Sequence, residues 1–94
     1  MAQKDVKISF SGNTISVDKE KVRVQKNNDT VVWSAHGEFG IVIDGQSTAA
    51  TQQGANWQVS LGPWSSVQTI KYDVTAPGKT TLDPDIEVME GPGS

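Results

Sequence analysis

The sequence predicts an all-β domain, a Greek-key β-sandwich or barrel of about seven or eight strands. Apolar and polar residues alternate with a period of two in short segments along the chain, which is the pattern of half-buried strands. Gly, Asn, Asp or Pro separate these segments at short intervals, as in sandwiches and barrels. No segment has the apolar period of a helix, and 94 residues provide for one small domain.

Each expected strand is identified by its alternate apolar residues. A turn at 11–13 separates the first two strands and a turn at 27–29 separates the third from the fourth, because Gly, Asn and Asp favour chain reversal. We expect the alternate apolar side chains to form the core. In chain order they are Val6, Ile8 and Phe10; Ile15 and Val17; Val22 and Val24; Val31, Val32 and Trp33; Phe39, Ile41 and Ile43; Trp57, Val59 and Leu61; Ile70, Tyr72 and Val74; Ile86 and Val88.

The segment 44–56 is the irregular part of the chain. It consists mostly of Gln, Ser, Thr, Ala and Gly and has no large apolar residue. About a dozen residues is long for an ordinary loop, and such loops are often functional or mobile. We therefore expect a loop here, with a single helical turn at 48–53 as its only regular element.

Composition excludes several classes of function. The absence of cysteine excludes disulfides, thiolate nucleophiles and metal sites built on thiolates. A net charge of −3 argues against a nucleic-acid binder held by phosphate contacts, and no apolar run approaches the roughly 20 residues of a membrane helix. We expect one domain at 1–90, with 91–94 as a cloning scar or linker. The compartment stays open: cytoplasmic as the chain stands, periplasmic or secreted if a signal peptide was removed.

Charge is unevenly distributed along the chain. Residues 1–26 hold six basic and three acidic groups, whereas residues 27–94 hold two basic and eight acidic groups. Lys19, Lys21 and Arg23 are expected on one side of a strand. We interpret them as a solvated face or as charges that protect a sheet edge from aggregation. The alternative is a small basic patch for an anionic partner.

Several of the predicted strands together resemble those of the cupredoxin family. Val31-Val32-Trp33 is an apolar strand that ends in an aromatic residue, and Ile41–Asp44 is an apolar strand that follows a loop. Near the end, Ile70–Val74 and Leu82–Val88 are two strands joined by a further loop. In cupredoxins, segments like these carry a blue-copper site of two His, one Cys and an axial Met. The resemblance implies a cupredoxin-like Greek-key domain; an immunoglobulin-like sandwich is the alternative fold.

The copper ligands that the resemblance implies are missing. Phe39 occupies the position of the first His, Val74 that of the Cys, and Leu82 that of the axial Met. The loop 75–81, where the second His would lie, has no His. A blue-copper site needs imidazole and thiolate donors. We therefore expect a cupredoxin-like domain with no copper, no other cofactor and no electron-transfer activity; a metal-handling or redox protein related to cupredoxins is an alternative.

Catalytic chemistry has little support in the sequence. His36 is the single His of the chain, and Ser34 lies two residues before it. A serine nucleophile needs its hydroxyl within hydrogen-bond reach of an oriented imidazole, and this spacing gives no reason to infer that geometry. His36 and Glu38 would be half of a metal site, with Asp83 or Asp85 as partners. We interpret them as surface residues instead, and predict no metal site, no catalytic residue and no enzyme.

Tryptophan suggests where a partner would bind. Trp64 lies in the turn sequence 62–66, where it is either an exposed anchor or a lid over one end of the sandwich. The expected function is a non-catalytic binding or assembly module for another protein or for a second copy, as a homodimer through a strand edge. The alternative is a carbohydrate-binding module. The candidate binding residues are Trp64, Trp57, His36, Glu38, Gln52 and Asn56.

Overall fold

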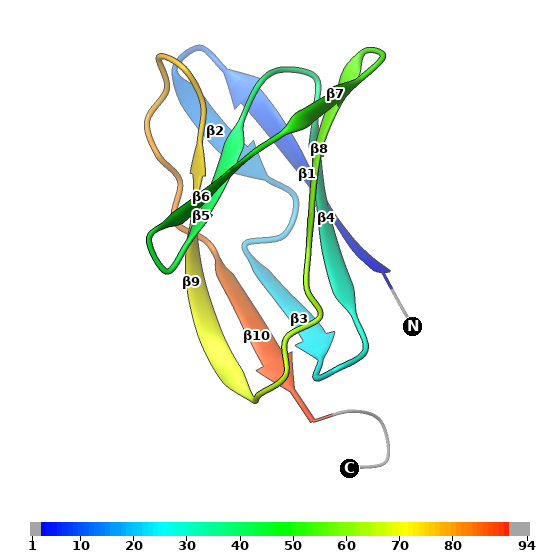
Figure 1. The fold of residues 1–94 in the computed structure, drawn as a ribbon. Helices are drawn as coiled ribbons and strands as arrows, with labels where there is room; N and C mark the ends of the chain where they lie inside the picture. The colour runs from blue at the N-terminus through cyan, green and yellow to red at the C-terminus, as the bar shows by residue number, and fades with distance from the viewer. Residues whose placement is uncertain (1–2, 91–94) are drawn as a thin grey trace.

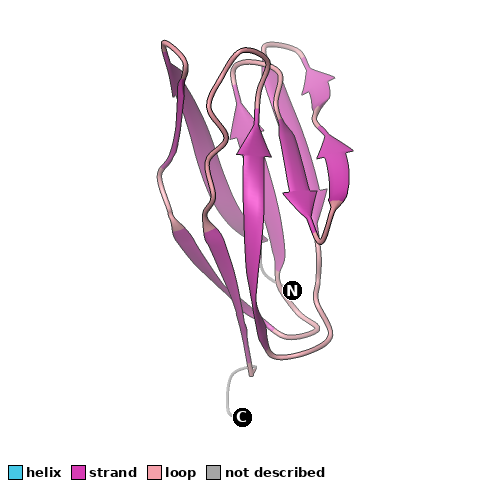
Figure 2. Cartoon of the chain, turned by 90° about the vertical axis from the view of Figure 1, so that its left-hand side faces the viewer, coloured by secondary structure: helices cyan, strands magenta, loops and turns pink. Residues whose placement is uncertain are grey.

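The computed structural model describes residues 3–90, which form a two-layered β-sandwich and contain no helix (Figures 1 and 2). The predicted all-β fold class is confirmed. The described residues accordingly offer no helix that could cross a membrane. The strands are β1 (Gln3–Ser11), β2 (Thr14–Val17), β3 (Lys21–Gln25), β4 (Thr30–Ala35), β5 (Gly40–Ile43), β6 (Gln46–Ala49), β7 (Thr51–Gln53), β8 (Asn56–Leu61), β9 (Gln68–Thr75) and β10 (Asp85–Met89). The predicted scar or linker at 91–94 lies outside the described residues.

Each layer is a sheet of five strands. The first sheet has the order β2-β1-β4-β8-β7 and the second β3-β10-β9-β5-β6. The pairs β1–β4 and β3–β10 are parallel, and the other neighbours are antiparallel. Consecutive strands form the edges on each side, β2 and β3 on one side and β6 and β7 on the other. The chain changes sheet at both of these connections, and also between β3 and β4, between β4 and β5, and between β8 and β9. In Figure 1, β6 and β7 run as one diagonal across the front of the molecule.

The core lies between the sheets and is formed by the alternate apolar residues. Period-two alternation in the strands places one set of side chains inward and leaves the other at the surface. The ends of several strands are only partly buried, among them Phe10, Ile43 and Leu61. The buried apolar residues are Val6, Ile8, Ile15, Val22, Val24, Val31, Trp33, Ala35, Phe39, Ile41, Val59, Ile70, Tyr72, Val74, Ile86 and Val88.

The expectation of an irregular segment at 44–56 is wrong, as is the helical turn at 48–53. This segment contains β6, β7 and the start of β8, which raises the number of strands to ten. Asp44 and Gly45 have φ of 52° and 77° and form a two-residue turn that pairs Ile43 with Gln46. A second two-residue turn, at 54–55, joins β7 to β8.

These two strands escaped prediction because their apolar partners lie elsewhere in the chain. Thr48 faces Ile41 across the β5–β6 ladder, and Gln52 faces Trp57 across the β7–β8 ladder. Polar strands of this kind carry no alternation of their own. The Asp-Gly pair directly after the Ile41–Ile43 run was the available signal, since it is a preferred two-residue hairpin turn.

One hydrogen bond joins the two sheets at the centre of the core. Trp33 of β4 belongs to the first sheet and Tyr72 of β9 to the second, and both are almost fully buried. The indole Nε1–H of Trp33 donates to the Tyr72 hydroxyl at 3.1 Å. Their rings pack edge to face with centroids 5.2 Å apart, an arrangement that aromatic rings favour. The pair therefore supplies both contact area and a satisfied polar group.

The environment of Tyr72 disfavours its ionised form. Burial raises the pKa of Tyr72 above its usual value of 10.0, the hydrogen bond from Trp33 lowers it, and the charges of Asp85 and Asp18 raise it further. The unfolded chain loses this proton near pH 10, whereas the folded chain keeps it to a higher pH. The contribution of Tyr72 to the free energy of unfolding is therefore present below pH 10 and declines as the pH rises above it.

We predict that Tyr72→Phe lowers the free energy of unfolding by about 1–3 kcal/mol at neutral pH, because the buried Trp33 N–H loses its acceptor. Denaturant unfolding measures this loss. Tyr72 is the single tyrosine of the chain, so tyrosinate absorbance reports on it alone. In the wild type this absorbance is expected to rise only above pH 10 in native conditions, and near pH 10 in denaturant. Equal titration in both conditions would contradict the shift.

Candidate functional site

The predicted binding residues do not form one site. Trp64 lines a hollow at one side of the sandwich, His36 and Asn56 line a second hollow, and Glu38 lines a third. Gln52 is exposed on β7, where its amide donates to the carbonyl of Gly54 at 3.4 Å. Of the six residues, only His36 and Asn56 line the same hollow.

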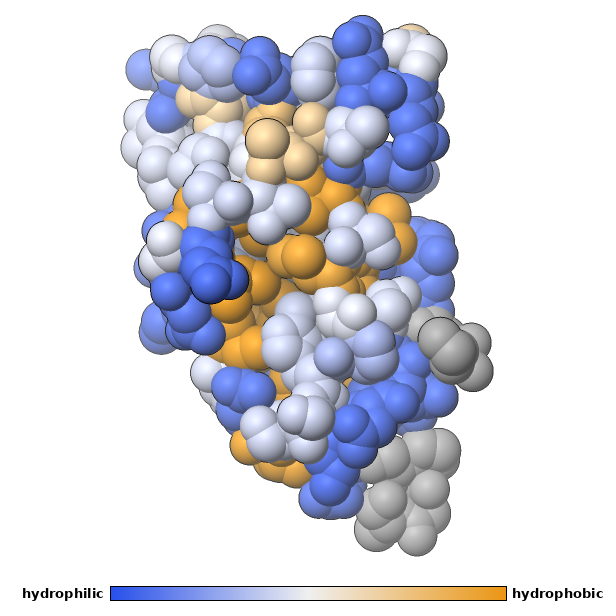
Figure 3. Space-filling view, in the orientation of Figure 1, coloured by the Kyte–Doolittle hydropathy of each residue, from blue (hydrophilic) through white to orange (hydrophobic). Residues whose placement is uncertain are grey.

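The hollow at Trp64 lies where the two sheets separate. Its volume is about 330 Å³, and it opens between the β5–β6 hairpin and the end of β8. Figure 3 shows apolar surface in the middle of this face, framed by polar residues. Apolar and polar groups meet around the hollow, as they do in small-molecule sites. The lining residues are Ile43, Asp44, Gln46, Thr48, Leu61, Gly62, Pro63 and Trp64.

The position of Trp64 is determined by its own turn and by a neighbouring one. Gly62 has a φ of 100°, and a Cβ atom there would lie 2.9 Å from Cζ3 of the Trp64 ring. Glycine is therefore needed for both the backbone conformation and the close approach. The N–H of Asn27, in the β3–β4 turn, donates to the carbonyl of Trp64 at 2.8 Å.

Trp64 is half-buried. Part of its ring packs against the core, and it also lines the hollow. Its burial is thus intermediate between the exposed anchor and the lid of the two interpretations. The part of the ring that faces the hollow is what a bound molecule would contact.

Trp57 lies at the opposite end of β8 from Trp64. It is paired with Ala35 on one side and Gln52 on the other, and it packs partly against the core. Its alternation with Val59 and Leu61 confirms the prediction that it belongs to the core or its rim. Because a strand separates them, Trp57 and Trp64 do not form one continuous aromatic surface.

The suggested metal half-site gains no further ligand from the fold. His36 is exposed just after β4, and Glu38 lies in a different hollow, beside Thr75 and Pro77. Asp83 and Asp85 line a fourth hollow with Glu20. Among residues 3–90, no three His, Asp or Glu side chains are grouped closely enough to hold a metal ion.

Of the three positions that the resemblance assigns to copper ligands, Val74 and Leu82 are neighbours and Phe39 lies near the start of the adjacent strand β5. Val74 and Leu82 form a bridge, with the N–H of Val74 donating at 2.8 Å and the N–H of Leu82 at 3.1 Å. Phe39 precedes β5, whose Ile41 pairs with Val74. Phe39 and Val74 are buried, and Leu82 is partly buried and packs against the core. Their hydrocarbon side chains offer no nitrogen or sulfur donor, so this set does not fit copper.

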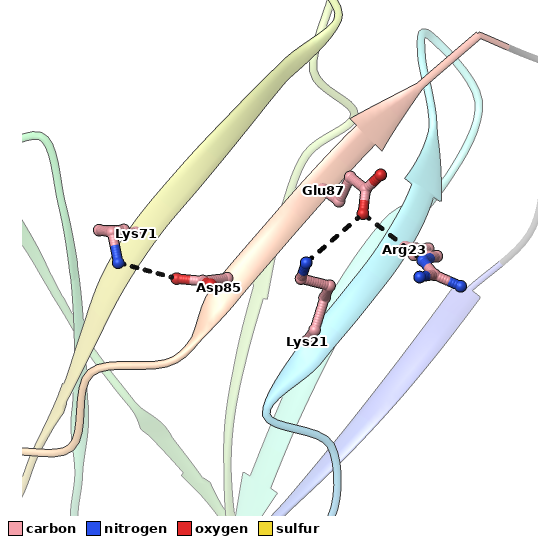
Figure 4. Close-up of polar contacts among 5 residues, drawn as sticks. All are labelled: Lys21, Arg23, Lys71, Asp85 and Glu87. Atoms are coloured by element: carbon pink, nitrogen blue, oxygen red, sulfur yellow. Dashed lines mark hydrogen bonds and ion pairs between the residues drawn. The ribbon is translucent and has the colours of Figure 1, made fainter.

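The charge asymmetry of the sequence is neutralised on the outer face of the second sheet. The parallel β3–β10 pair brings the basic early segment against the acidic late one (Figure 4). Glu87 Oε2 lies 3.5 Å from Arg23 Nε and 3.9 Å from Lys21 Nζ, and Lys71 Nζ lies 3.7 Å from Asp85 Oδ1. Such surface pairs contribute about 0–1 kcal/mol each. Their consequence here is that Lys21 and Arg23 are partly neutralised, which weakens the anionic-partner interpretation.

The two sides of the sandwich differ in how their edges are protected. On the β2–β3 side the chain carries Asp18, Lys19, Glu20, Lys21 and Arg23. On the other side, the edge formed by residues 46–53, which we call the β6–β7 edge, carries no charge. The whole stretch from 45 to 70 is free of charged residues. Proteins commonly protect exposed edges with charged side chains, so an uncharged edge is available for pairing.

Comparison with models of known protein families gives no match for this chain, and comparison with curated proteins gives no significantly similar sequence.

Proposed function

We propose that this protein is a non-catalytic binding or assembly module that meets another protein through the β6–β7 edge and the adjoining Trp64 hollow. The observation that carries this proposal is the uncharged, exposed edge strand beside a half-buried tryptophan. Gln46 and Thr48 belong both to the edge and to the wall of the hollow, so the two features form one surface. An edge strand offers backbone hydrogen bonds to an added strand, and a neighbouring pocket can select its side chains.

The charges elsewhere on the described surface support the β6–β7 edge and the Trp64 hollow as the binding surface. The outer face of the second sheet is occupied by ion pairs, and the β2–β3 side carries alternating charges. Tryptophan is among the residues that contribute most to interface energy when it is partly enclosed by its own protein. Trp64 meets this condition, because Gly62 and the Asn27 turn hold it in place.

The proposal includes a cupredoxin-like domain without a copper site. What supports it is that Val74 and Leu82 form a bridge and that Phe39 and Val74 are buried in the apolar core. Apolar side chains at these positions extend the core in place of a metal pocket. The alternative of a metal-handling or redox protein gains no donor from this set.

We predict that the purified protein, incubated with Cu²⁺ and freed of excess metal, retains no stoichiometric copper and shows no intense visible absorption band. The reason is the absence of thiolate and imidazole donors at the three core positions. Metal analysis and absorption spectroscopy measure the two properties. Stoichiometric copper together with an intense visible band would refute this part of the proposal.

We predict that Trp64→Ala weakens partner binding by about 30-fold or more, the loss of about 2 kcal/mol typical of a tryptophan hot spot. A partner captured from the native organism would be identified and its affinity re-measured with purified components. Trp57→Ala is the matched control: Trp57 faces Gln52 of β7 but lies outside the Trp64 hollow, so its loss should weaken binding less than the loss of Trp64. Unchanged partner binding and oligomeric state in Trp64→Ala would count against this surface.

A second candidate function is carbohydrate binding in the Trp64 hollow. The observation that favours it is the placement of Asp44, Gln46 and Thr48 around the same hollow as the indole of Trp64. An aromatic ring contacts the apolar face of a sugar, and carboxylate, amide and hydroxyl groups bind its hydroxyls. Without Trp57 on the same surface, such a site would accommodate a short saccharide.

If sugar binding is the function, titration with mono- and oligosaccharides will change the tryptophan fluorescence of the wild type. The change should be lost in Trp64→Ala and kept in Trp57→Ala, because only Trp64 lines the hollow. A glycan array would provide the ligands for titration. If no saccharide binds on the array and none changes the tryptophan fluorescence, carbohydrate binding is removed as a candidate function. The protein-partner proposal would then remain in place.

A further inference from the structure

The β6–β7 edge has free backbone groups in a symmetric arrangement. The N–H of Ala50 donates to the carbonyl of Phe39 at 3.0 Å. This bond determines which residues of β6 direct their backbone N–H and C=O groups toward β5. In an antiparallel edge strand, backbone groups alternate between the neighbouring strand and the open side. Thr48, two residues before Ala50, therefore points its backbone groups to β5, whereas Ser47 and Ala49 direct theirs away from the sheet. These two residues flank Thr48 on either side.

The geometry points to a second copy of this chain as the occupant of the edge, with β6 pairing antiparallel to β6 of the second copy about a two-fold axis at Thr48. Ser47 of each copy then faces Ala49 of the other, and each such pair exchanges both of its backbone hydrogen bonds. Thr48 faces its own counterpart as the close, non-hydrogen-bonded pair. This inference rests on the proposed function, and it names the partner.

The side chains of the edge are compatible with this symmetry. In this two-fold pairing residue 48 meets its own counterpart and residues 47 and 49 meet each other, so a charge at or beside the axis would lie close to the same charge of the second copy. The β6–β7 edge has none, and neither has the stretch from 45 to 70. Ser47 and Ala49 are small and exposed and leave room for a second strand. Threonine pairs across antiparallel strands are among the favourable ones.

The pairing also places the second copy at the Trp64 hollow. Thr48 and Gln46 form one wall of this hollow, and Ile43 and Leu61 contribute apolar surface to it. A strand added beside β6 extends the second sheet at this wall. The second copy would thus cover partly buried apolar groups as well as the free backbone groups, which supplies a hydrophobic contribution to association.

The decisive experiment is a charge exchange at the two-fold axis. We expect the wild-type chain to dimerise with rising concentration in sedimentation equilibrium and native mass spectrometry. Thr48→Lys alone and Thr48→Glu alone should each lose the dimer, because like charges would face one another. An equal mixture of the two variants should regain a dimer that contains one chain of each kind. This rescue requires that residue 48 meets its own counterpart.

Two further variants guard against a trivial loss of structure. Ala49→Pro removes an amide that points away from the sheet, so it should abolish the dimer while the fold, followed by thermal unfolding, persists. Thr14→Lys places the same charge on exposed β2 at the other side of the sandwich, and it should leave the dimer intact. Failure of Thr14→Lys to dimerise would overturn the assignment to β6.

The outcomes separate this inference from the proposed function. A wild-type chain that stays monomeric at every concentration overturns the second-copy inference, as does a dimer that both Thr48 variants leave unchanged. If that monomer still binds another protein in a manner that depends on Trp64, the binding-module proposal stands with a different partner. Loss of the dimer in each single variant and its return in the mixture would establish the β6–β6 pairing.

Discussion

The contact between Trp33 and Tyr72 is the interaction around which this small sandwich is organised. A domain of this size buries a limited core, and no disulfide is available to reinforce it. The pair joins β4 of one sheet to β9 of the other, and its 3.1 Å hydrogen bond satisfies an indole N–H that burial would otherwise leave unpaired. Because Trp33 and Tyr72 are the two largest fully buried side chains of the described residues, their contact is a major determinant of how the two sheets pack.

The same geometry explains why the two sides of the sandwich differ. The segment that joins the edge strands β2 and β3 is charged and is followed by cross-strand ion pairs, whereas the segment that contains the edge strands β6 and β7 is uncharged. In this uncharged segment, β6 pairs with the preceding strand β5 and β7 with the following strand β8. Those two neighbours supply the apolar residues, so the residues of β6 and β7 remain mostly small or polar. A side built in this way can accept another strand without desolvating charge.

Much of the candidate surface was visible in the sequence, but its assembly was not. The segment 44–56 and Trp64 were both singled out as candidates, the first for its length and composition and the second for its turn context. The sequence pattern did not reveal that 44–56 is mostly strand. Thr48 and Gln52 are held in strands by pairing with Ile41 and Trp57 of neighbouring strands, and not by apolar alternation of their own. The sequence also could not show that the candidate residues separate, with His36 and Asn56 in one hollow, Glu38 in a second and Trp64 in a third.

Alternation by itself determined the all-β class, the eight apolar strands and nearly all of the core, because a period of two assigns each side chain to one face of a strand without reference to the rest of the chain. The tertiary structure alone decided what contacts what. Lys21 and Arg23 meet Glu87 more than sixty positions away, and Asp44, Thr48 and Trp64 surround one hollow, because strand order in the sheets is a property of long-range pairing. Local pattern carries no information on which distant strand becomes a neighbour, and that choice defines the surface where this protein is proposed to bind.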